Sequence, residues 1–165
     1  MAEVWTAATS ARRRALGLSA GARSPTEVAL RLADDEVLAL IAEDHHGAMA
    51  MGVAVPARTD DGAGQDLLPG LLHVSFVAVR PDVWGLGLGE GVVRALMDEG
   101  VSQGFTSAQL WTQETNRRKR RLYERIGWTP TDRTKVDDDG EPIRQYVTNL
   151  RWRGSRSTGW GPGRA

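Results

Sequence analysis

The stretch RPDVWGLGLGEGVVRALM, residues 80–97, places four glycines between two apolar segments. Glycine costs roughly 1 kcal/mol relative to alanine inside a helix, so its repeated use where a helix begins needs a separate reason. The preceding segment LLHVSFVAV, residues 71–79, is apolar almost throughout, which predicts a central strand. Leu88 and Val92 then open an apolar helical spacing, which predicts a helix that runs to about Gly104.

A strand, a glycine-rich turn and a helix start, in this order, form a binding site for an anion. Backbone N–H groups of the turn and of the first helical turn lack partners inside the helix, and the helix dipole adds partial positive charge. Glycine has no Cβ, so a phosphate can approach this backbone closely. The dinucleotide fingerprint G-x-G-x-x-G fails, because counting from Gly85 its last position is Glu90, and no P-loop Gly-Lys-Ser/Thr follows. The segment therefore predicts a phosphate-bearing ligand that is bound in another way.

The remaining elements are predicted from periodicity, capping residues and turn residues. Three further helices are expected, over residues 5–16, 24–34 and 116–126. Five further strands are expected, over residues 36–44, 48–57, 107–113, 128–136 and 143–150, with a polar loop over residues 58–70. We expect one domain over residues 1–150, followed by a flexible Gly- and Arg-rich tail over residues 151–165.

Composition limits the class of protein. The chain has 165 residues, of which 41% are hydrophobic and 25% charged, as expected of one globular domain. Basic and acidic residues number 21 each, so the charge balance predicts no nucleic-acid and no membrane partner. There is no cysteine, which excludes a thiol nucleophile and a cysteine metal site. No apolar stretch approaches the roughly 20 residues that span a membrane, and we expect a cytoplasmic protein.

The glycine segment resembles the coenzyme-A signature of the GCN5-related N-acetyltransferase (GNAT) family, R/Q-x-x-G-x-G/A after a strand that ends in V-x-P. Here the strand ends in VAVRP, residues 77–81, and WGLGLG, residues 84–89, occupies the signature. Gly87 and Gly89 match the two small positions, whereas Trp84 stands where the family has Arg or Gln. Because backbone groups form the cradle, binding is expected to tolerate this departure.

A second segment resembles the same family independently. NRRKRRLYERIGW, residues 116–128, follows the pattern N-x-x-A-x-x-x-Y-x-x-x-G-F, in which Asn116, Tyr123 and Gly127 match. Lys119 replaces the usual small residue. Two motifs in the right order, with a predicted strand between them, are more specific than either one alone. The resemblance covers roughly residues 4 to 150.

The resemblance implies an α/β (α+β) fold with a mixed, mostly antiparallel central sheet flanked by helices. It implies an N-acetyltransferase that moves an acetyl group from acetyl-CoA to an amine by direct attack, without a metal. The implied cofactor-binding residues are Val77, Ala78, Val79, Trp84, Gly85, Leu86, Gly87, Leu88, Gly89, Asn116 and Tyr123. Val77 and Val79 would bond the pantetheine arm through backbone groups, in the manner of an added strand.

Acetyl transfer also needs a proton donor and a base. The resemblance makes Tyr123 the candidate general acid for the departing thiolate, and the bland alternative is a tyrosine that packs its ring on the sheet. His73, on the motif strand, is the candidate base because a pKa near 6.5 suits that task, and it could equally be a structural histidine. Glu114, at the end of the next strand, is the other candidate base. His45 and His46 occupy a predicted hairpin tip and make no metal site.

Two other functions stay open on the sequence. One is a non-catalytic acyl-CoA-binding regulatory module, which would bind the cofactor without turnover. The other is an RNA-binding protein that uses the basic run RRKRR, residues 117–121, together with the basic tail. On a helix that run spreads over several faces, and the zero net charge weighs against RNA.

The family sheet normally begins with a strand before its first helix, and only a few residues precede Trp5. That strand is therefore expected to be missing or truncated, which would leave a sheet edge to be paired or covered. The terminal hairpin and a tail containing Trp152 and Trp160 offer material for covering it. We therefore expect a homodimer.

Overall fold

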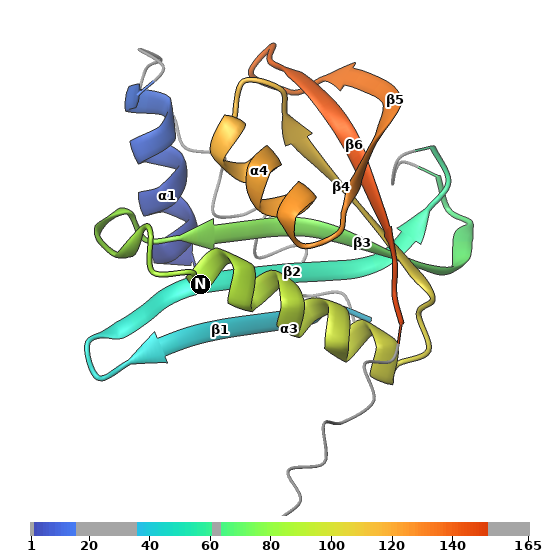
Figure 1. Cartoon of the computed structure of the whole chain (residues 1–165), viewed down its shortest axis with the longest axis horizontal. Helices are drawn as coiled ribbons and strands as arrows, with labels where there is room; N and C mark the ends of the chain where they lie inside the picture. Colours follow the sequence, from blue (N-terminus) through green and yellow to red (C-terminus); the bar gives the residue numbers. More distant parts are fainter. Residues whose placement is uncertain (1, 16–35, 61–63, 152–165) are drawn as a thin grey trace, which may run out of the picture.

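The computed structural model describes residues 2–15, 36–60 and 64–151 (Figure 1). The helix expected over residues 24–34 lies outside them. So does the expected tail beyond residue 151.

The six strands of the described residues form one sheet in the order β1-β2-β3-β4-β6-β5. Their bounds are β1 Leu38–Asp44, β2 Gly47–Arg58, β3 Leu67–Val79, β4 Ser107–Gln113, β5 Thr129–Val136 and β6 Pro142–Asn149. Within this described sheet β3 pairs with β4 in parallel and the other four pairings are antiparallel. The predicted mixed, mostly antiparallel sheet is confirmed, and β3 lies inside it as expected.

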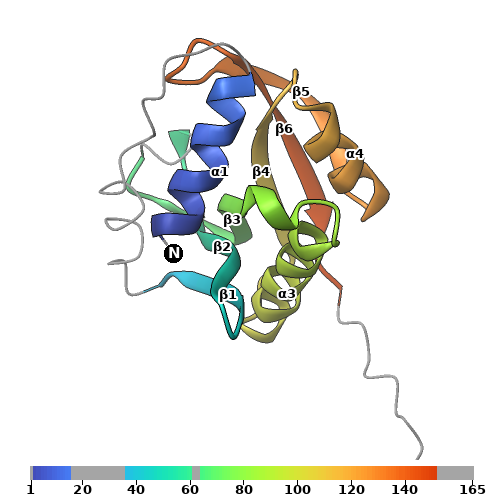
Figure 2. The same cartoon turned by 90° about the vertical axis from the view of Figure 1, so that its left-hand side faces the viewer.

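Helices cover both faces of the sheet (Figures 1 and 2). Helix α1, Ala2–Ala15, packs on β2 and β3, and its Trp5 ring meets the Phe76 ring edge-on with centroids 4.7 Å apart. Helices α3, Leu88–Ser102, and α4, Arg117–Arg125, share the core of the other face. None of the described helices has the length and apolar composition needed to cross a membrane.

The hairpin between β2 and β3 is longer than the sequence predicts. Residues 58–70 were expected to be a loop, but β2 reaches Arg58 and β3 starts at Leu67. The Thr59 N–H donates to the Asp66 carbonyl at 2.9 Å, and Arg58 pairs in register with Leu67. The polar, glycine-rich composition of these residues predicts a loop. They nevertheless extend the hairpin, because the hydrogen bonds between strands come from the backbone and need no apolar side chains.

Strand β3 parts from β4 halfway along its length. The parallel pairing joins Leu71–Val74 to Ser107–Leu110 and then stops. In the ladder with β2, Ser75 is an extra residue between two paired ones, which is a β-bulge. A bulge bends its strand and strengthens the local twist. Beyond Val74, β3 therefore stays paired with β2 while its β4-side edge has no strand partner among the described residues.

Helix α3 approaches the sheet closely at Gly52 of β2. A Cβ added at Gly52 would lie 2.4 Å from Cγ1 of Val92 and 2.7 Å from Cδ1 of Leu96, both in α3. Both side chains are buried in the core, so neither has free space to move into. The absence of a side chain at Gly52 therefore sets how near α3 lies to the sheet.

We expect Gly52→Ala to lower the free energy of unfolding by about 1–3 kcal/mol, because the new methyl overpacks the core. The matched control is Gly91→Ala, since Gly91 is an exposed residue of α3 whose Cβ would meet nothing within 4 Å. That control should gain up to about 1 kcal/mol from helix propensity. Urea unfolding measures both, and equal changes in the two variants would contradict the close approach.

Candidate functional site

The glycine turn joins the end of β3 to the start of α3 through a short 3-10 helix, Pro81–Val83. Gly85 and Gly87 have φ of 95° and 80°, a left-handed conformation that side chains disfavour. A Cβ at either glycine would meet nothing within 4 Å, so open space lies beside the turn. Gly87 is the N-cap of α3, and the N–H groups that follow it have no partners inside the helix. The predicted order of strand, glycine turn and helix start is confirmed, and anion binding at this turn stays a prediction.

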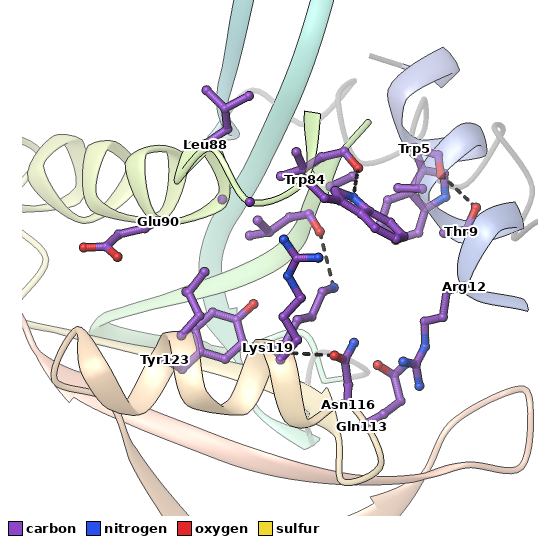
Figure 3. Close-up of a pocket in the computed structure, with 18 of the residues that line it drawn as sticks. Trp5, Thr9, Arg12, Trp84, Leu88, Glu90, Gln113, Asn116, Lys119 and Tyr123 are labelled. Atoms are coloured by element: carbon purple, nitrogen blue, oxygen red, sulfur yellow. Dashed lines mark hydrogen bonds between the residues drawn. The ribbon is translucent and has the colours of Figure 1, made fainter. Parts of the chain in front are cut away.

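A pocket of about 550 Å³ lies beside this turn (Figure 3). Ten of the eleven residues that the sequence assigned to cofactor binding line it: Val77, Ala78, Val79, Trp84, Gly85, Gly87, Leu88, Gly89, Asn116 and Tyr123. Leu86, the eleventh, is 72% exposed and is not part of the wall. Segments that are distant in the chain therefore meet at one cavity.

The free edge of β3 forms one wall of the pocket. The Arg80 N–H donates to the Met49 carbonyl of β2 at 2.8 Å, and successive residues of a strand turn their amide groups to opposite edges. The amide groups of Val77 and Val79 therefore face away from β2. Their carbonyls accept hydrogen bonds from two side chains, the Trp84 indole at 2.7 Å to Val79 and the Lys119 ammonium at 3.4 Å to Val77.

Helix α4 provides the opposite wall. The Asn116 side chain accepts a hydrogen bond from the Lys119 N–H at 3.2 Å, so it caps the helix and lines the pocket at the same time. The Tyr123 side chain is 4% exposed, and its ring centroid lies 6.0 Å from that of Trp128 and 6.1 Å from that of Tyr146. Tyr123 therefore packs in the core, as the structural interpretation expects, and it also borders the cavity.

Burial raises the pKa of Tyr123 well above its ordinary value, and burial is the sole cause. A phenol in that environment stays protonated throughout the neutral range. The pocket therefore holds a fixed, neutral O–H donor.

The charges around the cavity favour an anion. Arg118, Lys119 and Arg125 line it. Glu90, in the first turn of α3, accepts hydrogen bonds from Arg125 at 2.8 Å and Arg94 at 2.9 Å, and these bonds lower the pKa of the Glu90 carboxyl. The carboxylate at the helix start is thus balanced by its two guanidinium partners, and the rim keeps a positive surplus.

The consecutive basic residues of α4 do not form one continuous patch. The Arg120 guanidinium donates to the Tyr146 hydroxyl at 3.1 Å and to the Glu114 carbonyl at 3.2 Å. Arg117 and Arg121 are exposed, whereas Lys119 reaches into the pocket. This spread over several faces is the one that the sequence predicted.

Helix α1 also borders the cavity, which no sequence motif indicates. The Arg12 guanidinium donates a hydrogen bond at 2.9 Å to the carboxylate of Glu141, which lies near the opposite end of the described chain. Arg13 forms an ion pair with Asp139. These ion pairs join α1 to the acidic turn between β5 and β6, and all four side chains line the pocket. The two partners of the first pair lie 129 positions apart, and no motif spacing signals such a contact.

The two candidate bases lie elsewhere. His73 lines a second pocket of about 300 Å³ with Ser75 and Trp111, which shares only Gln113 with the first. The Glu114 carboxylate is ion-paired with Arg144 at 2.6 Å and lines neither pocket.

The two histidines of the hairpin tip are a turn, as expected. The Asp44 carboxylate accepts the His46 N–H at 2.8 Å, and the ring centroids of His45 and His46 are 3.8 Å apart. Within the part of the chain that the structure describes, no three His, Cys, Asp or Glu side chains are grouped as metal ligands.

The mixed sheet, the glycine turn and the open strand edge together define the acetyltransferase class of fold. A model of the acetyltransferase (GNAT) family matches residues 5–128. The chain therefore belongs to the GNAT family, and the resemblance noted in its two motifs is confirmed. No curated protein sequence matches the chain at a significant level.

Solved structures with the same fold are numerous, and three that share between 12% and 18% identity with this chain illustrate the likeness. The ribosomal-protein-S18-alanine N-acetyltransferase from Escherichia coli superposes with a TM-score of 0.65 at 18% identity, covering 84% of each chain. An aminoglycoside 6'-N-acetyltransferase complexed with coenzyme A gives 0.67 at 14% identity, covering 93% of this chain and 92% of that one. A GNAT acetyltransferase from Staphylococcus aureus MU50 gives 0.69 at 12% identity, covering 90% and 92%.

The environment of Tyr123 is testable by titration, because the chain has two tyrosines and burial also raises the pKa of the other, Tyr146. At about pH 10.5 an unperturbed tyrosine is mostly ionised. We expect the folded protein to show less tyrosinate absorbance there than the urea-unfolded protein, because the Tyr123 phenol stays protonated in the fold. Stability should correspondingly fall as the pH rises above about 10, since only the unfolded chain ionises.

Tyr146→Phe leaves Tyr123 as the one tyrosine, so the same titration then reports on it alone. A midpoint near 10 in that folded variant would contradict the burial of the phenol.

Proposed function

We propose that this protein is an acetyl-CoA-dependent N-acetyltransferase that acts on an amine. The observation that carries the proposal is the meeting of three features in one cavity. These are the glycine turn at the start of α3, the free edge of β3 and the buried hydroxyl of Tyr123. The glycine turn would bind the phosphates of acetyl-CoA, the strand edge would pair with the amides of its arm, and the hydroxyl would protonate its departing sulfur.

Coenzyme A would bind along this cavity from the glycine turn toward α1. The unpartnered N–H groups after Gly87 would hold the pyrophosphate, with Arg118 and Arg125 close by. The pantetheine amides would pair with the edge at Val77 and Val79, as a short added strand does. The neighbour complexed with coenzyme A supports this assignment through its shared fold.

The acetyl group would pass directly to the acceptor. The amine nitrogen attacks the thioester carbonyl carbon, the C–N bond forms, and the C–S bond breaks. Tyr123 donates its proton to the departing thiolate, and the raised pKa keeps that proton in place until then. The attacking amine loses a proton to a base, and solvent later restores the proton of Tyr123.

His73 is the base that we propose. Val74 faces the core shared with α3 and α4, so its neighbour His73 points to the opposite face of the sheet. An amine in the second pocket would therefore reach the thioester through the gap that opens after Val74, with His73 beside it. Glu114 fits this task less well, because its carboxylate is engaged by Arg144.

Two of the structural neighbours support an amine as the acceptor. One is described as acting on the alanine of ribosomal protein S18, and the other on the 6' position of an aminoglycoside. An amine panel of alanine-starting peptides, lysine peptides and aminoglycosides therefore tests the function, with released thiol as the readout. Because the chain contains no cysteine, a thiol reagent detects only released coenzyme A. Tight binding of acetyl-CoA without turnover on any amine would favour the regulatory module instead.

We expect Gly89→Val to weaken coenzyme A binding at least tenfold, which is about 1.4 kcal/mol. Gly89 lines the pocket, and a Cβ there makes ordinary contacts of 3.5 Å to Val79 and 3.6 Å to Leu122, so the fold should persist. Gly91→Val is the control, because it adds the same side chain to the exposed face of the same helix. Calorimetry showing equal affinity for coenzyme A in the two variants would contradict the cradle.

We expect Tyr123→Phe to lower kcat by about 10²-fold, with coenzyme A affinity little changed, because the ring stays and the proton donor is removed. Pre-steady-state kinetics would establish that chemistry limits the rate. Unchanged kcat under that condition would reject the general-acid role. The wild-type rate should show no alkaline decline due to Tyr123 below about pH 10, since its raised pKa keeps the phenol protonated.

A further inference from the structure

Two side chains occupy the hydrogen-bonding edge where the amide arm of the cosubstrate would pair (Figure 3). The Trp84 indole N–H donates to the Val79 carbonyl at 2.7 Å, and the Lys119 ammonium donates to the Val77 carbonyl at 3.4 Å. These are the two carbonyls that β3 turns toward the cavity after it leaves β4. We refer to Trp84 and Lys119 together as the edge plug.

The plug and an added strand need the same acceptors. A peptide-like ligand that pairs with a strand edge donates its amide N–H to the edge carbonyls. The Trp84 indole and the Lys119 ammonium can only donate, so each uses the position that a ligand amide would take. Both side chains also line the cavity and fill space next to the edge.

The plug is specific to this chain rather than to its motifs. Trp84 stands where the glycine signature has Arg or Gln, and Lys119 stands where the α4 pattern has a small residue. Both departures from the pattern thus meet at one strand edge. A small residue at position 119 could not reach the Val77 carbonyl.

Neither side chain is locked in place. Trp84 is 43% exposed and lies in the glycine turn, where it is steadied by the Arg118 guanidinium 5.4 Å from its ring centroid. Lys119 is half-buried, and a flexible four-carbon stem carries its ammonium group. Hydrogen bonds in such surroundings contribute modestly, so a ligand can replace them.

We propose that the edge plug closes the β3 edge in the cosubstrate-free protein and that the pantetheine arm displaces it. The inference rests on the proposed function, since it needs coenzyme A to bind along this edge. The plug competes with the pantetheine arm for the Val77 and Val79 carbonyls. It does not compete with the nucleotide end of the ligand, which would bind at the glycine turn.

The test compares two ligands by calorimetry. Coenzyme A contains the arm, whereas adenosine 3'-phosphate 5'-diphosphate has the same nucleotide and pyrophosphate without it. The variants are Trp84→Phe, which keeps a ring and removes the N–H, and Lys119→Met, which keeps an unbranched side chain and removes the ammonium. Arg121→Met is the matched control, because Arg121 is an exposed cation of the same helix and lies outside the cavity wall.

The ratio of the two affinities is the readout, because any effect on the phosphates cancels in it. We expect each plug variant to raise the ratio in favour of coenzyme A by about fivefold, the effect of about 1 kcal/mol from one modest hydrogen bond. Arg121→Met should leave the ratio unchanged. An unchanged ratio in both plug variants, or a ratio that falls, would overturn the plug, since a falling ratio means that these side chains hold the arm.

NMR spectroscopy can observe the plug directly. The indole N–H resonance of Trp84 is assigned as the one that is missing from the spectrum of Trp84→Phe. We expect this resonance to shift further when coenzyme A is added than when the arm-free nucleotide is added, since only the arm displaces the indole from Val79, and equal shifts would overturn the plug. If the chemical shift of this resonance stays unchanged with both ligands although coenzyme A binds, the plug is overturned and the proposed function remains intact. Failure of every variant and of the wild type to bind coenzyme A overturns the proposed function, and the plug with it.

Discussion

The parting of β3 from β4 after Val74 and Leu110 is the feature on which the site depends. The bulge at Ser75 lies at that point and bends β3 away while its ladder with β2 continues. One strand therefore remains anchored on one side and has an edge without a strand partner among the described residues on the other. A fully paired β3 would have left no strand edge for a ligand.

The same strand carries the chain from the open edge directly into the glycine turn. Donors at the start of α3 and acceptors at Val77 and Val79 consequently border one cavity. Helix α4 completes it with Asn116 and Tyr123, which are seven positions apart and so lie on one face of the helix. One strand end and two helices thus bring a helix N-terminus, a strand edge and a buried phenol to one cavity.

Local patterns predicted much of this arrangement, and long-range contacts account for what was missed. The strand before the glycines, the cap at Asn116 and the bounds of β4 could be predicted, because periodicity and capping are properties of neighbouring residues. The pairing of Arg12 with Glu141 could not be, since it depends on how α1 crosses the sheet. The sequence shows that Trp84 departs from the Arg or Gln of the glycine signature. The hydrogen bond from its indole N–H to the Val79 carbonyl could not be predicted, because it depends on the path of the turn.

The side chains around the cavity differ in how firmly they are held. Tyr123 is buried against Trp128 and Tyr146, so moving it would require repacking of the core. Trp84 is 43% exposed and Lys119 is attached by a flexible stem, so both can leave the edge at little cost in packing. The Tyr123 phenol, which we propose as the proton donor, therefore keeps its position whether or not the edge is occupied. Under the proposed function, a ligand that opens the edge would therefore meet the Tyr123 phenol already in place, and only Trp84 and Lys119 would have to move.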